Sequence, residues 1–319
     1  MDIKPPYVAS PHRYDQQETI YRRCGNSGVL LPKVSLGFWH NFGATDPYTR
    51  SRDITHYAFD HGITHFDLAN NYGPPYGTAE ETMGKLMRED FAPYRDELFI
   101  SSKAGYDMWE GPYGNWGSRK YLMASLDQSL RRMNLDYVDL FYSHRYDPIT
   151  PLEETLQALV DIVRSGKALY VGISRWPLEA LKFADEYLRQ RDVPLLIYQG
   201  KLNMLDREPM DEHITDYCAD HGIGFISFSP LAQGLLTDRY INGIPEGSRM
   251  SRESSLSSDT LTPELIAQLR TWNDEALSKG YTLAEMALRW ILDQRGVTSV
   301  LVGASSTAQL EKNIKCMTE

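Results

Sequence analysis

The chain alternates short runs rich in Val, Ile, Phe and Tyr with longer segments of helical period, and this alternation limits its fold more than any other feature. Strands that alternate with helices are typical of parallel sheets built from βαβ units. The clearest helical segments are 51–62, 118–134, 151–166 and 177–192. Strands are predicted at 33–37, 63–69, 98–104, 137–144, 168–174, 195–200, 224–230 and 298–304. Eight such units predict an α/β fold in which the strands close into a (β/α)8 TIM barrel.

Two connections are longer than such a barrel requires. Residues 105–118, after the third strand, are rich in aromatic residues and glycine, and residues 235–262, after the seventh strand, are polar. Because the loops that follow the strands form the active-site face of a barrel, we expect both to overhang the active site. We expect residues 1–17 to form a loose N-terminal arm, and residues 18–319 to form a single barrel domain.

Charge and composition argue against several classes of partner. The net charge of -10 and the pI near 5.3 leave no basic surface for nucleic acid or for an anionic membrane. No segment approaches the roughly 18 apolar residues that a membrane span needs. Cys24, Cys218 and Cys316 form no C-x-x-C pair, so neither a zinc site nor a disulfide framework is indicated. We therefore expect a cytoplasmic protein that acts on a small molecule.

Polar residues follow several predicted strands, at the end of the barrel where active sites lie. Asp67 ends the second strand with Tyr72 just beyond it, Lys103 ends the third strand, and His144 ends the fourth. Taken singly, each is more often a turn or core residue. Together they suit a general acid that protonates a carbonyl oxygen while another group delivers hydride.

Tyr72 is the candidate acid of this set. The pKa of a tyrosine is ordinarily about 10, and a nearby cation such as Lys103 would favour its phenolate and lower that pKa. Asp67 would keep this lysine charged inside the barrel. His144 would donate a hydrogen bond to the substrate oxygen and fix its orientation.

These residues, with further motifs in the same order, resemble the aldo-keto reductase superfamily over nearly the whole chain. "DLANNYG" at 67–73 is similar to its Asp-to-Tyr signature, "SSKAG" at 101–105 to its lysine strand, and "YSHR" at 142–145 to its histidine strand. The runs that resemble its cofactor contacts are "GIS" at 172–174, "YQ" at 198–199, "FSPLAQGLL" at 228–236 and "GASSTAQLEKN" at 303–313. The resemblance implies a reductase with Asp67, Tyr72, Lys103 and His144 as catalytic residues.

The resemblance also implies NADP(H) bound without a Rossmann domain, and no G-x-G-x-x-G run opens a helix after a strand. Ser174 and Gln199 would bind the nicotinamide carboxamide, and Phe228 would stack on its ring. The adenosine end would meet Asn313 and the N-terminus of the last helix, which offers free N–H groups to a phosphate. The implied cofactor contacts are Gly37, Phe38, Trp39, Ser174, Arg175, Gln199, Phe228, Ser229, Pro230, Leu231, Gln233, Gly234, Leu235, Arg239, Arg249, Gly303, Ser305, Gln309 and Asn313.

The sequence departs from the superfamily pattern at three places. Arg175 follows Ser174 where Asn is common, and Lys312 stands where an acid is common. The chain ends at Glu319, before the C-terminal tail that usually helps to close the substrate pocket. The inference about substrate is the one most affected.

Within the superfamily, the chain resembles two groups that share the long loop after the seventh strand. These are the voltage-gated potassium channel β-subunits and a bacterial group that reduces L-glyceraldehyde 3-phosphate and methylglyoxal. The runs "ANNYGPP" at 69–75 and "KAGYDMWEGPYG" at 103–114 resemble the bacterial group, and His144 stands where the channel subunits typically have Asn. The resemblance thus implies NADPH-dependent reduction of small aldehydes and, by analogy, a homo-oligomer of four or more subunits.

The substrate contacts we expect are Trp39, Tyr72, Trp109, Trp116, His144 and Arg145. The tryptophans would narrow the mouth of the barrel, and Arg145 would bind a phosphate or hydroxyl group, unless it only pairs with Asp147. Two other functions stay open from the residues alone. One is a cofactor-sensing regulatory subunit. The other is a metal-dependent barrel hydrolase, although "THFD" at 64–67 lacks the H-x-H pair common there. Six other histidines we interpret as core or surface residues: His40, His56, His61, His65, His213 and His221.

Overall fold

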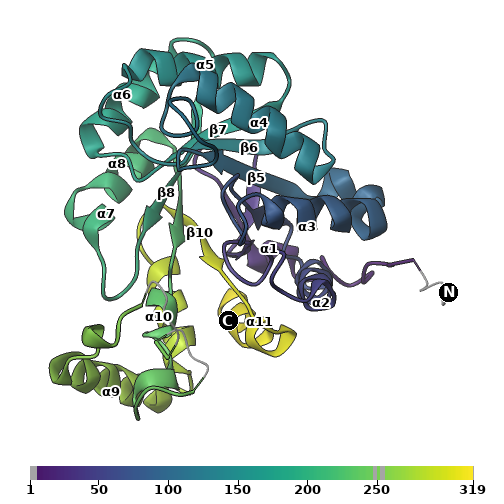
Figure 1. Ribbon diagram of the computed structural model, residues 1–319. Coiled ribbons are helices and arrows are strands. Elements are labelled where there is room, and N and C mark those ends of the chain that lie inside the picture. The colour runs from purple at the N-terminus through teal and green to yellow at the C-terminus, as the bar shows by residue number, and fades with distance from the viewer. Residues whose placement is uncertain (1–5, 247–249, 252–255, 319) are drawn as a thin grey trace.

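The computed structural model describes residues 6–246, 250–251 and 256–318. Eight parallel strands close into a barrel in the order β10-β3-β4-β5-β6-β7-β8-β9. Figure 1 shows these strands in the middle of the molecule with helices around them. The barrel strands are β3 (Val34–Gly37), β4 (His65–Asp67), β5 (Phe99–Ala104), β6 (Val138–Ser143), β7 (Ala168–Ser174), β8 (Leu195–Lys201), β9 (Gly224–Phe228) and β10 (Val297–Val302). The prediction of a (β/α)8 TIM barrel is confirmed, and each predicted strand overlaps one of these.

The α-helices lie in the connections of the barrel, with additional ones near the N-terminus and after β9. Helix α4 begins where the Oγ of Ser118 accepts a hydrogen bond from the N–H of Tyr121, and it ends at Asn134 in the left-handed conformation with a φ of 54°, which Asn tolerates well. The α-helices are α1 (Gln17–Ile20), α2 (Tyr48–Asp60), α3 (Thr78–Leu86), α4 (Arg119–Met133), α5 (Leu152–Arg164), α6 (Leu178–Arg189), α7 (Glu208–Asp211), α8 (Ile214–His221), α9 (Pro263–Ser278), α10 (Leu283–Leu292) and α11 (Thr307–Ile314).

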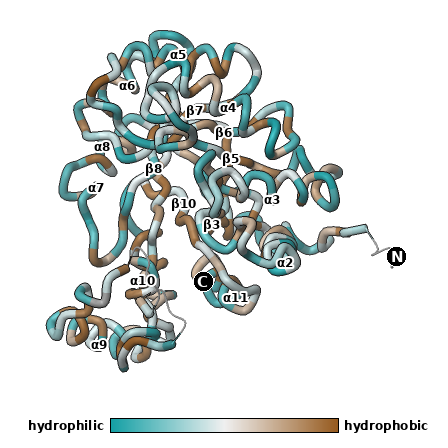
Figure 2. The backbone as a smooth tube through the Cα atoms, in the orientation of Figure 1, coloured by the Kyte–Doolittle hydropathy of each residue, from teal (hydrophilic) through white to brown (hydrophobic). Residues whose placement is uncertain are grey.

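The main core lies between the strands and the helices. Residues such as Phe66, Phe141, Leu159 and Val300 are fully buried in it, and Figure 2 shows hydrophobic residues along the strands and many hydrophilic residues on the outer helices. Burying apolar surface between these two layers is what drives the helices onto the barrel.

The N-terminal end of the barrel is closed by an antiparallel hairpin that we did not predict. It consists of β1 (Tyr21–Arg23) and β2 (Leu30–Pro32). Cys24 and Leu31 are buried in a cluster with Leu140, Ile197 and Leu301 from the barrel strands. The hairpin therefore covers the end of the barrel opposite the ends of the strands that carry active sites.

The described part of the N-terminal arm packs against the barrel domain. The hydroxyl of Tyr7 donates to Asp60 at 2.8 Å, and the ring of Tyr7 stacks on His56 with centroids 3.8 Å apart. Arg13 forms an ion pair with Glu97 at 2.8 Å. The expectation of a loose arm is therefore wrong for residues 7–13, since polar contacts and stacking fix them in place.

The two long connections lie after the strands that the sequence indicated. Residues 105–118 join β5 to α4, and the segment after β9 reaches α9 through short 3-10 helices, η3 (Ala232–Gly234), η4 (Asp238–Tyr240) and η5 (Ser258–Thr260). Among the residues that the structure describes, no helix is long and apolar enough to span a membrane, and no cluster of His, Cys, Asp or Glu suits a metal ion. The three cysteines are free and buried.

Candidate active site

A buried ion pair lies at the C-terminal ends of β4 and β5. The Nζ of Lys103 donates to the Oδ2 of Asp67 at 2.5 Å and to the backbone oxygen of Leu68 at 2.7 Å. Both side chains of the pair are almost fully buried. Burying either charge without its partner would cost several kcal/mol of folding free energy, so each residue requires the other.

Tyr72 and His144 complete the cluster, so the structure brings all four predicted catalytic residues together. The hydroxyl of Tyr72 lies 3.4 Å from the Nζ of Lys103. The rings of Tyr72 and His144 have centroids 5.8 Å apart and meet at 70°. A substrate oxygen placed between these two rings could accept hydrogen bonds from both.

Burial raises the pKa of Tyr72 well above its usual value of 10, and the carboxylate of Asp67 raises it further. The expectation that Lys103 brings this pKa below its usual value is therefore wrong. Burial also lowers the pKa of Lys103, against the effect of Asp67. The reason is that the loss of hydration on burial outweighs the attraction between the phenolate and Lys103, whose charge is partly balanced by Asp67. Tyr72 keeps its proton at neutral pH.

His144 is neutral in this environment. Burial lowers its pKa well below the usual value, and the cations Lys103, Arg175 and Arg145 lower it further. Its side chain is 8% exposed, and its Nδ1 has no hydrogen-bond partner among the described residues. A neutral imidazole can orient a carbonyl oxygen by a hydrogen bond without competing with Tyr72 as the acid.

The residues expected at the nicotinamide end lie beside this cluster. Ser174 and Gln199 pair in register at the ends of β7 and β8 and are buried. The amide of Gln199 also donates to Asp67 at 3.3 Å. Arg175 has a left-handed backbone with a φ of 57° and is exposed, and its Nη1 lies 3.4 Å from the hydroxyl of Tyr106. Arg175 therefore points along the rim toward the loop after β5.

The segment after β9 turns sharply. Ser229, Ala232 and Gln233 have positive φ angles of 52°, 46° and 58°, a conformation that costs energy outside glycine. The turn is supported by Asn203, which is fully buried and donates from Nδ2 to the backbone oxygen of Ser229 at 3.1 Å. We did not predict Asn203 from the sequence, where nothing distinguishes it from a loop residue. The half-buried ring of Phe228 and the backbone of residues 229–235 thus lie beside Gln199 at the rim of the barrel.

The residues expected at the adenosine end lie around the start of α11. Gln309 accepts hydrogen bonds from the N–H and hydroxyl of Ser305 at 2.9 and 3.0 Å, and Ser306 caps the helix. Asn313 is 4% exposed, and its Nδ2 has no partner among the described residues. Arg239 is exposed, whereas Arg249 lies outside the described residues.

The start of the site, after β3, is only partly as expected. Trp39 is 44% exposed and can meet a ligand. The ring of Phe38 is fully buried and stacks on Phe42 with centroids 3.9 Å apart, which leaves only its backbone for a cofactor. Gly37 and Gly303, at the ends of the paired strands β3 and β10, lie on the same rim.

Arg145 is held rigidly next to His144. Its guanidinium lies 3.6 Å from the centre of the Trp116 ring and 4.4 Å from that of Tyr106. It donates to the backbone oxygen of Gly105 at 2.7 Å and to Asn115 at 2.6 Å. The alternative that Arg145 merely pairs with Asp147 is therefore wrong.

Asp147 has other partners. It accepts hydrogen bonds from Thr150, from the N–H of Gly117 and from that of Ile149. Of the other two expected substrate contacts in this loop, Trp116 is 38% exposed, while Trp109 packs at 5.0 Å on Tyr121. Sequence reasoning missed Tyr106 and Asn115, which position Arg145.

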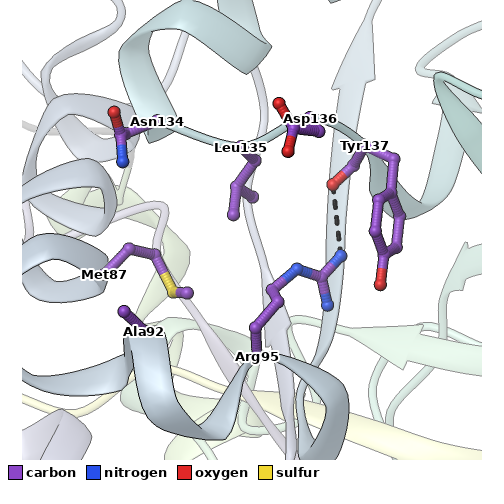
Figure 3. A pocket seen from close by; sticks show the side chains of 7 residues that line it. All are labelled: Met87, Ala92, Arg95, Asn134, Leu135, Asp136 and Tyr137. Carbon is purple, nitrogen blue, oxygen red and sulfur yellow. Dashed lines mark hydrogen bonds between the residues drawn. The ribbon is translucent and has the colours of Figure 1, made fainter.

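A pocket of about 180 Å³ lies at the other end of the barrel. Figure 3 shows Arg95 pointing into it below Leu135 and donating to the backbone oxygen of Tyr137 at 3.1 Å. Arg95 also pairs with Asp139 at 2.9 Å. Because its residues precede β5 and β6, this pocket is remote from the cluster around Lys103, and its arginine is already satisfied by protein groups.

Comparison with known proteins agrees with this geometry. The chain is 55% identical over 315 residues to L-glyceraldehyde 3-phosphate reductases of Escherichia coli O157:H7 and of strain K12, an alignment that covers 98% of this chain and 90% of each relative. It is 33% identical over 303 residues to a probable voltage-gated potassium channel subunit beta of Arabidopsis thaliana, covering 93% of this chain and 90% of the relative. Residues 33–319 match the model of the aldo/keto reductase family. The chain belongs to this family.

Proposed function

We propose that this protein reduces small aldehydes to alcohols with NADPH, and that Tyr72 is the general acid. The observation that carries the proposal is the buried Asp67–Lys103 pair with the Tyr72 hydroxyl 3.4 Å from Nζ and a neutral His144 beside it. This arrangement offers a proton and a hydrogen-bond donor to one substrate oxygen. Among the described residues, no group of His, Cys, Asp or Glu side chains suits the metal ion of a barrel hydrolase.

The residues present fit a nicotinamide cofactor. The amide nitrogen of Asn313 is buried without a partner in the described part of the chain, which suits a base that would accept its hydrogen bond. Ser174 and Gln199 offer a hydroxyl and an amide at the catalytic end. When bound, the cofactor supplies the hydride that the protein itself cannot provide. Its phosphates would meet Arg239, Arg249 and the first turn of α11.

The protein residues then have separate roles in the reduction. His144 orients the carbonyl oxygen by a hydrogen bond, and the hydroxyl of Tyr72 transfers its proton to that oxygen as negative charge develops there. Lys103 stabilises the phenolate that is left, and Asp67 keeps Lys103 in place. Solvent returns the proton to Tyr72 before the next turnover.

The direct test is the oxidation of NADPH in the presence of a panel of aldehydes, followed by absorbance. Loss of NADPH that requires both protein and aldehyde supports the proposal. A protein that binds NADPH tightly but oxidises it with none of the aldehydes would instead favour a cofactor-sensing subunit. Similarity to the Arabidopsis channel subunit makes that the second candidate function, at 33% identity against 55%. From its composition we also propose that the protein is cytoplasmic, and by analogy with relatives that share its long loops we propose a homo-oligomer of four or more subunits.

For substrate, we expect methylglyoxal and glyceraldehyde 3-phosphate to have a higher kcat/KM than a long alkanal or a steroid ketone. Trp39 and Trp116 leave little room for a large ring system, and the fixed guanidinium of Arg145 suits a phosphate or hydroxyl group. In Arg145→Gln, kcat/KM for the phosphorylated aldehyde should fall about tenfold or more, since a hydrogen bond to a charged group contributes about 1.5–3 kcal/mol. The value for methylglyoxal should change less.

Two outcomes would contradict this substrate assignment and leave the proposed reductase activity in place. One is a steroid ketone reduced as efficiently as the three-carbon aldehydes. The other is an equal loss for both aldehydes in Arg145→Gln, which would mean that the arginine only supports the loop after β5.

For the cofactor, we expect tighter binding of NADPH than of NADH, measured by fluorescence titration. Arg239→Ala and Arg249→Ala should weaken NADPH binding by about 1.5–3 kcal/mol per lost charged hydrogen bond and NADH binding by less, because only NADPH carries the 2'-phosphate. Arg295→Ala is the matched control, since this exposed arginine pairs with Asp220 and precedes β10 at the other end of the barrel. Equal dissociation constants for the two nucleotides in the unaltered protein would overturn the preference.

A further inference from the structure

A chain of polar side chains runs through the interior of the barrel below the catalytic cluster. Barrel interiors are usually filled by Val, Ile and Leu. Here four fully buried polar residues lie beneath Asp67, on adjacent strands of the closed sheet: Ser299 on β10, Ser35 on β3, His65 on β4 and Ser101 on β5. So many polar groups in a core are costly unless hydrogen bonds satisfy them.

The upper half of this chain reaches the catalytic carboxylate. The hydroxyl of Ser101 donates to the Oδ1 of Asp67 at 2.7 Å. Ser101 Oγ lies 3.1 Å from the Nε2 of His65. Oδ2 of the same carboxylate accepts from Lys103, so Ser101 and Lys103 hold its two oxygens from different sides.

The lower half of the chain ends at the backbone. The Nδ1 of His65 lies 2.9 Å from the Oγ of Ser35, which lies 2.7 Å from the Oγ of Ser299. Ser299 donates to the backbone oxygen of Pro32 at 2.6 Å. A carbonyl oxygen accepts hydrogen bonds only, as does an ionised carboxylate, so both ends of the chain require a proton from it.

This hydrogen-bond chain has five contacts but only four donor protons, one fewer than it needs. There are five contacts from Asp67 to Pro32. The three serine hydroxyls and a neutral imidazole supply four protons. Burial lowers the pKa of His65 to about 4, with Lys103 adding to the decrease and Asp67 opposing it, so at neutral pH the imidazole carries one proton only.

The tautomer of His65 decides which end is satisfied. With the proton on Nε2, His65 donates to Ser101 and Ser101 donates to Asp67. One contact in the lower half, between His65 and Pro32, then lacks a donor proton. With the proton on Nδ1, His65 donates toward Ser35, and Ser101 can satisfy either Nε2 or Asp67 but not both. Hydrogen bonds to a charged acceptor are roughly twice as strong as neutral ones, so the Nε2–H tautomer is favoured.

We propose that His65 and Ser101 are positioning residues of the reductase: the Nε2–H tautomer of His65 commits the Ser101 hydroxyl to Asp67 and thereby fixes the carboxylate that orients Lys103 toward Tyr72. The kinetic consequence rests on the function proposed above. The tautomer follows from the hydrogen-bond geometry and the neutral imidazole, and does not depend on that function.

The first test is the tautomer, read from the ring nitrogen NMR shifts of isotope-labelled histidine, with His65→Gln used to assign the signal. The unaltered protein is expected to show Nε2–H. Ser299→Ala should keep Nε2–H, since it removes the shortage at the lower end. Ser101→Ala should change the signal to Nδ1–H, because the hydroxyl of Ser35 is then the acceptor left in this hydrogen-bond chain for the imidazole N–H. Nδ1–H in the unaltered protein, or Nε2–H in Ser101→Ala, would overturn the assignment.

The second test is kinetic. Ser101→Ala should lower kcat about tenfold with little change in KM, because it removes one hydrogen bond to a charged group, and Ser101→Thr, which retains the hydroxyl, should recover both the rate and the Nε2–H tautomer. Ser102→Ala is the control: this neighbour on β5 is equally buried, but its hydroxyl donates to Glu80, so kcat should stay within about twofold.

The two tests fail separately. An expected tautomer pattern with unchanged kcat in Ser101→Ala would overturn the positioning role and leave the hydrogen-bond chain in place. A protein with no reductase activity at all would overturn the proposed function, while the tautomers could still be measured.

Discussion

Tyr72→Phe is expected to lower kcat for aldehyde reduction by roughly 10²–10⁴-fold, the usual contribution of a general acid. The substitution removes only the hydroxyl, which lies 3.4 Å from Lys103 and donates no hydrogen bond to another described protein group. The fold and NADPH binding should therefore be retained. Stopped-flow measurement of a single turnover would show the loss in the hydride-transfer step itself, and not in product release.

The pH dependence of this variant provides a second check. Burial raises the pKa of Tyr72, so the unaltered enzyme should keep its protonated acid, and hence its kcat, through neutral pH and lose activity only in alkaline solution. Tyr72→Phe should lose this alkaline decrease together with the rate. If the variant kept more than about a tenth of the rate, Tyr72 would not be the acid, and His144 would be the next residue to test.

The fold and the clustering of the four candidate catalytic residues could be predicted because each depends on a local pattern. Strands of a parallel barrel place their C-terminal residues at one rim whatever the details of packing. It was therefore enough to see that Asp67, Lys103 and His144 each end a β-rich run, and that Tyr72 follows the first of them at once.

The features that escaped prediction depend on contacts between distant segments. His65 was interpreted as a core or surface residue, and nothing in "THFD" indicates that Ser35 and Ser101 lie on either side of its ring, since this depends on the register of three strands. The partners of Arg145 were missed for the same reason. The packing of the Arg145 guanidinium against Tyr106 and Trp116 depends on how the loop after β5 folds, which periodicity does not determine.

The sign of the shift in the Tyr72 pKa was wrong for a related reason. A list of neighbouring residues suggested that a cation close to the phenol would dominate. The structure shows the cation paired with Asp67 at 2.5 Å and the phenol partly buried, with burial raising its pKa. Where a charge is already paired, desolvation decides the direction of the shift.

Lys103→Met is expected to lower kcat by about 10²–10³-fold, as the loss of a group that stabilises developing charge commonly does. It should also lower the free energy of unfolding by about 3–5 kcal/mol, because it leaves the carboxylate of Asp67 buried without its cation. Urea unfolding followed by circular dichroism, beside steady-state kinetics, would measure both effects.

A second substitution separates the two effects. In Asp67→Asn/Lys103→Met no charge remains to be buried, so most of the lost stability should return, while kcat stays low because nothing stabilises the phenolate of Tyr72. Arg132→Met is the matched control, since it breaks another buried pair, in which Arg132 donates to Glu80 at 2.7 Å, away from Tyr72. That variant should lose stability and keep its kcat. Recovery of kcat in the double variant would show that Lys103 acts only by stabilising the fold, and the role assigned to it here would be wrong.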